Sequence, residues 1–553
     1  MLPPPALRGI FRTDARARAA YAEGAGIYRI LPQAVTRPLD LEDLKTLISW
    51  ATEHRVALVP RAAGSAMGGG NVGDGVLVDL TGMSRRLEVD ATAGRAVTSA
   101  NVSLAELNST AALHALRLPP DPSSGRWATL GGMVSTNAAG ARSVRYGSVR
   151  RWVEGLLMIT AEGEVVMLRR GGVIPAASGE GALTRFYRDV APRIQAASRL
   201  IADRFPRTRK NSSGYALDAY LTSGDVLDLI IGAEGTLGIV SEIGWRLDPI
   251  PPFRAGLRVH LASLDRLSEV VSALNEYQPS ALELLDRTFL DLVGAGTGEG
   301  VSSGFVPEAI LLVEMERSDP EALRQVLAGA CEAIQRWATS IETAYSPPEA
   351  ERLWVIRHAA SPILAGLPEN RRSLQVIEDA CVPVDRMGDY ISSVRRLAAD
   401  RGLPVVMFGH AGDGHIHVNL LPELARSGWE AQVAALFEEV TDVVVRLGGT
   451  PSGEHGDGRL RAGSLGRVFG EEIVDLFQAV KRAFDPLGIF NPGIILPSAD
   501  PPIGRLKVGP QAATIPADIQ KALREIELTG GYGRCRLELA GEVGSRESGV
   551  GSS

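Results

Sequence analysis

A glycine-rich stretch at residues 61–75 lies between two short apolar segments, and this arrangement limits the folds open to the chain. Gly68–Gly73 (GGGNVG) satisfies the pattern G-x-G-x-x-G, which binds dinucleotides in a Rossmann fold only when a strand precedes it and a helix follows. Here residues 74–80 (DGVLVDL) follow, and they predict a strand. The sequence therefore argues against a Rossmann site. The loop suits a nest of unhindered backbone N–H groups around a pyrophosphate, with a simple turn as the alternative.

Two further segments combine prolines or glycines with long runs of small side chains. Residues 119–147 (PPDPSSGRWATLGGMVSTNAAGARSVRYG) begin with prolines around an aspartate and continue with small residues. Residues 232–240 (GAEGTLGIV) have the same character. Small side chains over so long a stretch bring the backbone close to a large, flat molecule. The three segments together favour a cofactor site over a flexible turn.

The composition is that of a globular protein and excludes several classes of function. With 553 residues, the chain is long enough for several domains of roughly 150 residues each. The net charge of −7 is spread along the chain, with no basic block of the kind that binds nucleic acid. The cysteines, Cys331, Cys381 and Cys535, provide no disulfide framework and no complete iron–sulfur ligand set. No signal peptide and no apolar run of membrane-spanning length is present, so we expect a cytoplasmic protein.

Hydrophobic periodicity predicts a change of architecture near residue 250. Before it, Asp40 caps an amphipathic helix, and short strands at 56–59 and 76–80 are followed by others up to about residue 247. The proline-rich stretch 248–253 (DPIPPF) marks a boundary. After it, strands alternate with amphipathic helices, which predicts an α+β domain on an antiparallel sheet. The strands expected there are 257–261, 309–316, 403–408 and 415–421, and the helices are 264–277, 320–337 and 386–401.

Four of the eight histidines fall between residues 410 and 455. The segment 409–421 (GHAGDGHIHVNLL) predicts a hairpin whose period-two alternation places His415, His417 and Asn419 on one face. The turn is expected to bring His410 alongside His417, so that two imidazoles from adjacent strands could bind one metal ion. Residues 448–459 (GGTPSGEHGDGR) add an adjacent carboxylate and imidazole. A carboxylate with two imidazoles suits Zn²⁺, Mn²⁺ or Fe²⁺; ordinary polar residues in a glycine-rich turn are the alternative.

The three small-residue segments together resemble the FAD-binding domain of the vanillyl-alcohol oxidase and p-cresol methylhydroxylase superfamily. Within it, the resemblance is to the D-lactate, glycolate and D-2-hydroxyglutarate dehydrogenases, over residues 10–497. It implies an α+β fold: a two-subdomain FAD-binding domain of the p-cresol methylhydroxylase type, then an α+β substrate (cap) domain with an antiparallel sheet. The implied parts are an N-terminal arm (1–33), the FAD-binding domain (34–247), the cap domain with the metal site (248–482), a segment returning to the FAD domain (483–497) and a tail (498–553).

The resemblance also implies which residues hold the cofactor. The first loop has no histidine of the kind that carries covalent flavin, so we expect non-covalent FAD. Ala62 and Ala63 stand where the family commonly has glycines, which alters the loop slightly. The residues expected to hold the pyrophosphate are Arg61, Gly64, Ser65, Gly69 and Gly70. Those expected to line the flavin and its ribityl chain are Pro120, Asp121, Thr129, Gly132, Ser135, Gly140 and Ile239.

The same resemblance assigns roles around the histidine cluster. His410, His417 and Glu454 are the implied ligands of a divalent metal, with Zn²⁺ preferred and Mn²⁺ or Fe²⁺ as alternatives. His455 is the implied catalytic base. Asn419 is expected to contact the substrate, and His415 to support a ligand.

Arg357, in the segment RLWVIRHAAS, resembles the arginine with which the family binds a substrate carboxylate; a solvated helical arginine is the alternative. Relatives that act on longer diacids have a lysine where Ile377 stands, which leaves a second carboxylate clamp in doubt.

These residues predict an FAD-dependent dehydrogenase that oxidises a small 2-hydroxy acid to the 2-oxo acid. A divalent metal lowers the pKa of the substrate hydroxyl, a neutral histidine accepts the proton, and flavin N5 takes the hydride. One alternative is a non-catalytic flavoprotein subunit of an electron-transfer complex. Another is a metal-dependent hydrolase; a serine-hydrolase variant would use Gly300–Gly304 (GVSSG), which lacks the required strand-to-helix context.

The tail resembles the start of the iron–sulfur module fused to larger relatives. That module begins with a Cys-Asn-Gly-x-Gly-x-Cys-Arg pattern; here Thr529 replaces the first cysteine and Cys535 keeps the second. We therefore expect the remnant of a fusion, partly disordered in its last ten residues. Electrons would then pass to a separate acceptor: a quinone, an electron-transfer flavoprotein, a cytochrome or an iron–sulfur protein. Peripheral attachment to a membrane and a homodimer are compatible with this scheme.

Overall fold

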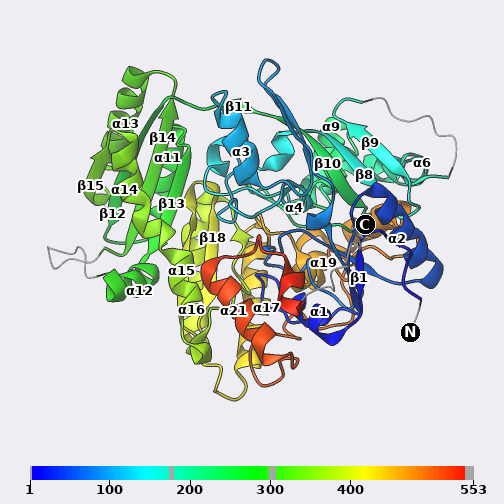
Figure 1. Ribbon diagram of the computed structural model, residues 1–553. Helices are drawn as coiled ribbons and strands as arrows, with labels where there is room; N and C mark the ends of the chain where they lie inside the picture. Colours follow the sequence, from blue (N-terminus) through cyan, green and yellow to red (C-terminus); the bar gives the residue numbers. More distant parts are fainter. Residues whose placement is uncertain (1–2, 173–179, 298–306, 542–553) are drawn as a thin grey trace, which may run out of the picture.

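The structure is a computed structural model that describes residues 3–172, 180–297 and 307–541. Three main sheets organise these residues, with the seven-stranded sheet (green) on the left of Figure 1 and the five-stranded sheet (cyan) at the upper right. The serine-hydrolase motif at 300–304 lies outside the described residues. So do the last ten residues, in which we expected disorder, since the described part of the chain ends at residue 541.

The first sheet contains four strands in the order β1-β2-β4-β3. Strands β2, β4 and β3 pair in parallel, and β1 pairs antiparallel with β2, so part of the expected N-terminal arm belongs to this sheet. The bounds are β1 (Ile10–Arg12), β2 (Ala34–Arg37), β3 (Leu58–Arg61) and β4 (Val76–Asp79). The glycine-rich loop joins β3 to β4, so a strand follows it, as predicted. Strand β3 begins two residues later than expected and contains Pro60, which an edge strand tolerates.

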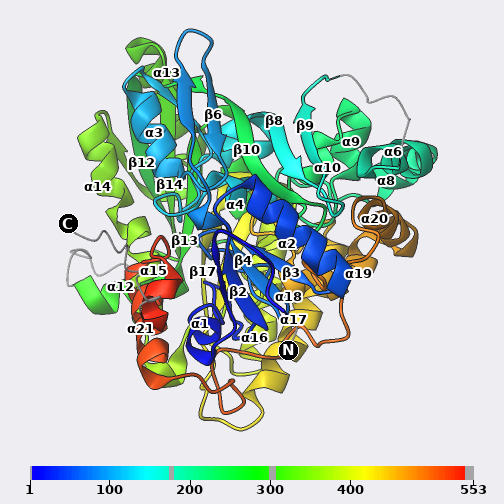
Figure 2. The ribbon, with the colours of Figure 1, turned by 45° about the vertical axis from the view of Figure 1, so that its right-hand side comes forward.

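Helix α2 (Leu41–His54) connects β2 to β3 and lies in front of the first sheet in Figure 2. Asp40 caps it, as predicted, because its side chain accepts hydrogen bonds from two backbone N–H groups of the first turn. Its apolar face is buried against β3 and β4. The residues on this face are Leu44, Leu47, Ile48 and Ala51.

The second sheet is antiparallel, with five strands in the order β5-β6-β10-β8-β9. Its strands are β5 (Leu87–Asp90), β6 (Arg95–Ser99), β8 (Val153–Ile159), β9 (Val165–Arg169) and β10 (Ile239–Arg246). The short helix α4 (Leu130–Thr136) contacts β6 and β10 and carries part of the second small-residue segment. This half of the chain therefore places the second and third small-residue segments side by side.

The third sheet is antiparallel throughout, in the order β15-β12-β14-β13-β17-β18-β16, which confirms the predicted α+β architecture. The strands are β12 (Phe253–Leu261), β13 (Ala281–Asp286), β14 (Ala309–Arg317), β15 (Ala338–Ala344), β16 (Ala380–Cys381), β17 (Val405–His410) and β18 (His415–Leu420). The predicted hairpin is β17–β18, and its turn is a 3-10 turn at Ala411–Asp413.

Helices cover both faces of the third sheet. One face packs against α11 (Leu267–Glu276), α13 (Pro320–Ile334), α16 (Met387–Ala399) and α17 (Trp429–Arg446). The other face packs against α12 (Arg287–Thr297), α14 (Pro347–His358) and α15 (Ala360–Ala365). Alternation along β14 supports this arrangement, because Leu311 faces the first group and Leu312 the second. The helices predicted in this region are α11, α13 and α16.

The chain returns to the N-terminal half earlier than expected. We expected the return to begin at residue 483, but the two helices that begin before it already pack there. Helices α19 (Leu465–Phe469) and α20 (Glu471–Phe484) are buried in the core of the second sheet, beside α6 (Ala182–Arg185) in Figure 2. The apolar face of α20 drives this return. Ile489 then accepts a backbone hydrogen bond from Leu58 (N···O 2.7 Å), so the segment closes against β3.

The tail is folded up to residue 541. Helix α21 (Ala517–Thr529) and the 3-10 turn Arg536–Ala540 share a small core with α1 (Ala15–Ala20). Figure 1 shows α21 (red) at the front of the molecule, where it contacts α15. Among the helices that the structure describes, none combines the length and the apolar character needed to cross a bilayer.

Candidate active site

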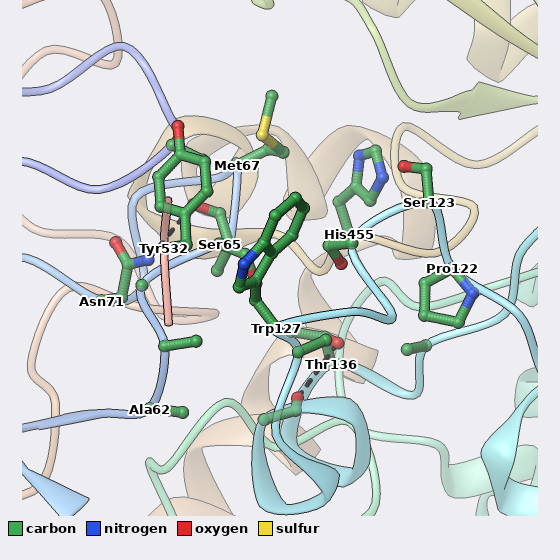
Figure 3. A pocket seen from close by; sticks show the side chains of 18 of the residues that line it. Ala62, Ser65, Met67, Asn71, Pro122, Ser123, Trp127, Thr136, His455 and Tyr532 are labelled. Carbon is green, nitrogen blue, oxygen red and sulfur yellow. Dashed lines mark hydrogen bonds between the residues drawn. The ribbon is translucent and has the colours of Figure 1, made fainter. Parts of the chain in front are cut away.

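A cavity of about 740 Å³ joins the small-residue segments to the histidine cluster. Its walls include residues 60–67 at the end of β3 and in the first loop, most of residues 127–139 around α4, and several of residues 234–240 at the start of β10. Figure 3 shows Trp127 projecting between Tyr532 and His455, with Met67 and Ser65 of the first loop nearby. Segments that are far apart in the sequence therefore meet around one cavity of the size that holds a cofactor.

Most residues expected to hold the cofactor line this cavity. They are Arg61, Gly64, Ser65, Gly70, Thr129, Gly132, Ser135 and Ile239. The other four, Gly69, Pro120, Asp121 and Gly140, do not line it. Asp121 accepts a hydrogen bond from the backbone N–H of Arg142, and Gly140 packs so closely against Asp121 that a Cβ would lie 2.4 Å from its carbonyl carbon. Asp121 and Gly140 therefore contact each other close to the cavity without lining it.

Arg61 supports the first loop with its side chain. Its buried guanidinium donates to the backbone carbonyls of Tyr21, Glu23 and Asn71, at 2.8–3.4 Å. Gly64 crosses above it with a φ of +83°, and a Cβ there would lie 2.5 Å from the guanidinium. Position 64 therefore needs a glycine, because the Arg61 guanidinium leaves no space for a Cβ and the positive φ disfavours other residues.

Three side-chain atoms converge at the histidine cluster. His410 Nε2 lies 3.3 Å from His417 Nε2 and 3.2 Å from Glu454 Oε1, and His417 Nε2 lies 3.7 Å from the same carboxylate oxygen. Ligand atoms bound at about 2.0–2.2 Å to a four-coordinate zinc ion lie about 3.3–3.6 Å apart. The three predicted ligands therefore fit a divalent metal, and all three line the cavity.

The outward-facing atoms of these three residues are held by other groups. His410 Nδ1 donates to Glu283 Oε1 (2.5 Å) and His417 Nδ1 donates to the carbonyl of Glu378 (2.8 Å), which leaves each Nε2 lone pair facing inward. Glu454 Oε2 accepts from Lys210 Nζ and from the backbone N–H of Gly140, both at 2.9 Å. These contacts orient the donor set before any metal is bound.

His455 lies next to the donor set and faces the cavity. Its ring stacks on that of His417, with centroids 5.6 Å apart and planes 13° apart. His455 Nδ1 lies 2.7 Å from Glu378 Oε2, and Nε2 lies 3.5 Å from Glu454 Oε1. Although burial opposes the charged form, Glu378 and Asp379 raise the pKa of His455 to about 10. The two carboxylates therefore favour the imidazolium form, and the ring can accept a further proton only from its neutral form.

Arg357 and Asn419 complete the polar part of the cavity. The side chain of Arg357 is only 12% exposed, which contradicts the solvated alternative. Its Nε donates to Glu283 Oε2 (2.7 Å), and its guanidinium lies over the ring of Phe408 at 4.8 Å. Asn419 Oδ1 accepts from Ser373 Oγ (3.1 Å). Glu283 therefore holds Arg357 with one oxygen and His410 with the other.

Two family models match the chain in order. The FAD binding domain matches residues 32–169, and the C-terminal domain of FAD linked oxidases matches residues 250–495. This chain belongs to the FAD-linked oxidases. The resemblance drawn from the small-residue segments is confirmed, and FAD is the cofactor that the family's N-terminal domain binds.

Several named relatives align with most of this FAD-linked oxidase. The glycolate oxidase subunit GlcD of Bacillus subtilis is 28% identical, over 84% of this chain and 89% of its own length. The D-lactate dehydrogenase of Archaeoglobus fulgidus is 29% identical, over 84% and 91%. The D-2-hydroxyglutarate dehydrogenase of Escherichia coli is 27% identical over 92% of this chain, which spans only 53% of that protein.

Solved structures share the fold of this FAD-linked oxidase. p-Cresol methylhydroxylase superimposes with a TM-score of 0.64 at 15% identity and covers 88% of this chain and 94% of its own. An alkyldihydroxyacetonephosphate synthase gives a TM-score of 0.58 at 16% identity, over 87% and 83%. These solved structures therefore share the fold of this chain over most of its length.

The site also depends on several residues that the sequence did not predict. Glu283, Lys210 and the pair Glu378 and Asp379 are all buried and contact the donor set or His455. His415 contacts Asp379 (3.0 Å) and Lys210 (3.3 Å). Charged residues inside apolar segments, such as Glu283 in ALELLD and Glu378 in VIEDACV, were the available signal, because an acidic residue is rarely buried without a partner.

Proposed function

We propose that this FAD-linked oxidase is a dehydrogenase that oxidises a small 2-hydroxy acid to the corresponding 2-oxo acid. The observation that carries the proposal is that three metal-type donor atoms, His455 and Arg357 all face one cavity with the small-residue segments. The relatives named for glycolate, D-lactate and D-2-hydroxyglutarate support the same substrate class.

Removing a hydride from the carbon of an alcohol requires removal of the hydroxyl proton as well. In its neutral form His455 is suited to accept this proton, because Glu378 fixes its Nδ1 and leaves Nε2 toward the cavity. Arg357 is suited to bind the substrate carboxylate, since among its described contacts only Nε is hydrogen-bonded and both Nη groups remain available. Asn419 offers its amide to the substrate from the end of β18.

FAD and a divalent metal would supply the remaining chemistry. The small-residue segments would hold FAD, whose chemistry is that of a hydride acceptor. His410, His417 and Glu454 would hold the metal, with Zn²⁺ preferred over Mn²⁺ or Fe²⁺, and a cation there would make the substrate hydroxyl more acidic. We expect the FAD to be non-covalent and the electrons to pass to a separate acceptor, such as a quinone, an electron-transfer flavoprotein, a cytochrome or an iron–sulfur protein.

Anaerobic bleaching of the bound flavin tests this function. The purified yellow protein is mixed with a panel of D- and L-2-hydroxy acids, with and without a chelator, and the flavin absorbance is followed. We expect bleaching by at least one monocarboxylic 2-hydroxy acid and its loss after metal removal. Failure of the whole panel to reduce a metal-loaded flavoprotein would contradict the proposal.

A further inference from the structure

The folded tail forms part of the cavity wall. Glu527, Leu528, Thr529 and Gly530 of the α21 end, together with Tyr532, line the cavity. In Figure 3, Tyr532 lies to the left of Trp127, on the same side as Ser65 and Asn71 of the first loop. Cβ atoms at Gly530 and Gly533 would lie 2.7 and 2.9 Å from the Trp127 indole, so the tail packs directly on that ring.

At the end of this wall, Glu527 lies among three cations. Arg372 and Arg524 line the cavity with it, and Lys507 lies behind it. Glu527 pairs with Arg372, with Lys507 Nζ at 3.2 Å and with Arg524 Nη1 at 3.2 Å. Although burial opposes the charged form, Lys507 and Arg372 lower the pKa of Glu527 to about 2, so this group is a carboxylate at neutral pH.

Arg372 belongs to the substrate end of the cavity. The next residue, Ser373, donates its Oγ to Asn419 Oδ1 (3.1 Å). Leu374 and Leu420 exchange two backbone hydrogen bonds of 2.8 and 3.1 Å, which fix this segment along the end of β18. Arg372 therefore stands next to the strand that carries His417 and Asn419.

We propose that Glu527 occupies, from within the chain, the position in which the distal carboxylate of a dicarboxylic 2-hydroxy acid would bind, and thereby selects monocarboxylic substrates. This inference rests on the proposed function and narrows its substrate class. Arg372, the arginine that would bind the second carboxylate of such a substrate, is already paired with the carboxylate of Glu527. An incoming dianion would have to displace Glu527 and would then face its charge nearby.

The test uses binding as well as turnover. The FAD-loaded protein is titrated with glutarate and with butyrate, two carboxylic acids that have no 2-hydroxyl group to oxidise, and calorimetry gives each Kd. We expect the wild type to bind glutarate no more tightly than butyrate. In Glu527→Gln the affinity for glutarate should rise roughly tenfold or more, since a charged arginine is freed for a charge-assisted hydrogen bond.

Two further variants test whether any gain in glutarate affinity depends on Arg372. The double variant Glu527→Gln/Arg372→Gln removes both charges of the pair and should lose the gain in glutarate affinity. Glu525→Gln removes an exposed carboxylate of the same helix that does not line the cavity, and should leave the ratio of the glutarate and butyrate Kd values unchanged. Thermal denaturation and flavin content confirm that each variant is folded.

Steady-state turnover is then measured with D-2-hydroxyglutarate and with D-lactate. We expect kcat/KM for D-2-hydroxyglutarate, relative to that for D-lactate, to be higher in Glu527→Gln than in the wild type. A wild type that prefers glutarate, or a Glu527→Gln variant with unchanged glutarate affinity, overturns the inference. Flavin that no 2-hydroxy acid reduces, with the glutarate affinity still responding to Glu527, would count against the proposed function alone.

Discussion

Glu378 Oε2 lies 2.7 Å from His455 Nδ1, and this contact fixes the orientation of the imidazole ring. A carboxylate only accepts hydrogen bonds, so Nδ1 carries a proton and Nε2 is directed toward the cavity. Arg461 Nη2 holds the second oxygen of Glu378 at 2.5 Å. A buried arginine thus keeps the carboxylate in place, and the carboxylate keeps the base in place.

Replacement of His455 by asparagine should lower the rate of flavin reduction by about 100-fold or more, because the hydroxyl proton then has no acceptor. Anaerobic stopped-flow absorbance measures this rate. FAD and metal contents should stay at wild-type levels, since His455 is not among the three donors. Glu378→Gln serves as the matched variant and should lower kcat by a smaller factor while KM changes little. Unchanged reduction in His455→Asn would remove the ring from the mechanism.

Replacement of Glu283 by glutamine should weaken metal binding by about 10- to 100-fold, the effect usual for a group that orients a ligating histidine. Competition with a chromogenic chelator measures the affinity directly, without turnover. Substrate KM should rise in the same variant, because Glu283 also holds Arg357. Equal metal affinity in the variant and the wild type would show that the His410 contact is dispensable.

Arg357→Lys should lower kcat/KM for a 2-hydroxy acid by about tenfold or more, although it keeps the positive charge. An ammonium group cannot bind a carboxylate in two places and at the same time donate to Glu283. Steady-state kinetics with an artificial acceptor measures the change. A variant as efficient as the wild type would place the substrate carboxylate elsewhere.

Gly140→Ala should destabilise the protein by about 2 kcal/mol or more, because φ is +123° and the new Cβ would meet the Asp121 carbonyl carbon at 2.4 Å. Gly163→Ala is the matched control: its φ is +76°, but a Cβ there meets nothing within 4 Å. It should cost only the backbone strain of about 1 kcal/mol. Urea denaturation measures both, and equal costs would contradict the predicted clash.

Glu234 should make the free energy of unfolding fall as the pH rises from about 4.5 to about 8. Burial, and then the neighbouring Asp457, raise its pKa from 4.5 to about 8. In this window the unfolded chain loses a proton that the folded chain keeps, so folding becomes less favourable. Glu234→Gln should therefore gain stability relative to wild type at pH 8.5 more than at pH 5.5 in urea denaturation. The exposed Glu53→Gln should show no such difference.

The class of fold and most of the candidate site residues could be predicted from the amino-acid sequence. Local patterns predicted the strand after the glycine loop, the Asp40-capped helix and the β17–β18 hairpin, because turn chemistry and periodicity act over a few residues. The position of Arg357 in the cavity followed only from the family resemblance.

The charged groups that support the site could not be predicted, because long-range packing brings them together. Glu283, Lys210 and Glu378 come from separate segments, and nothing local to them indicates that they meet the histidines or His455. The same holds for Glu527, which reaches Arg372 across 155 positions of sequence. Burial makes such partners obligatory, since a charge removed from water must be paired, but the identity of each partner is set by the packing of whole elements.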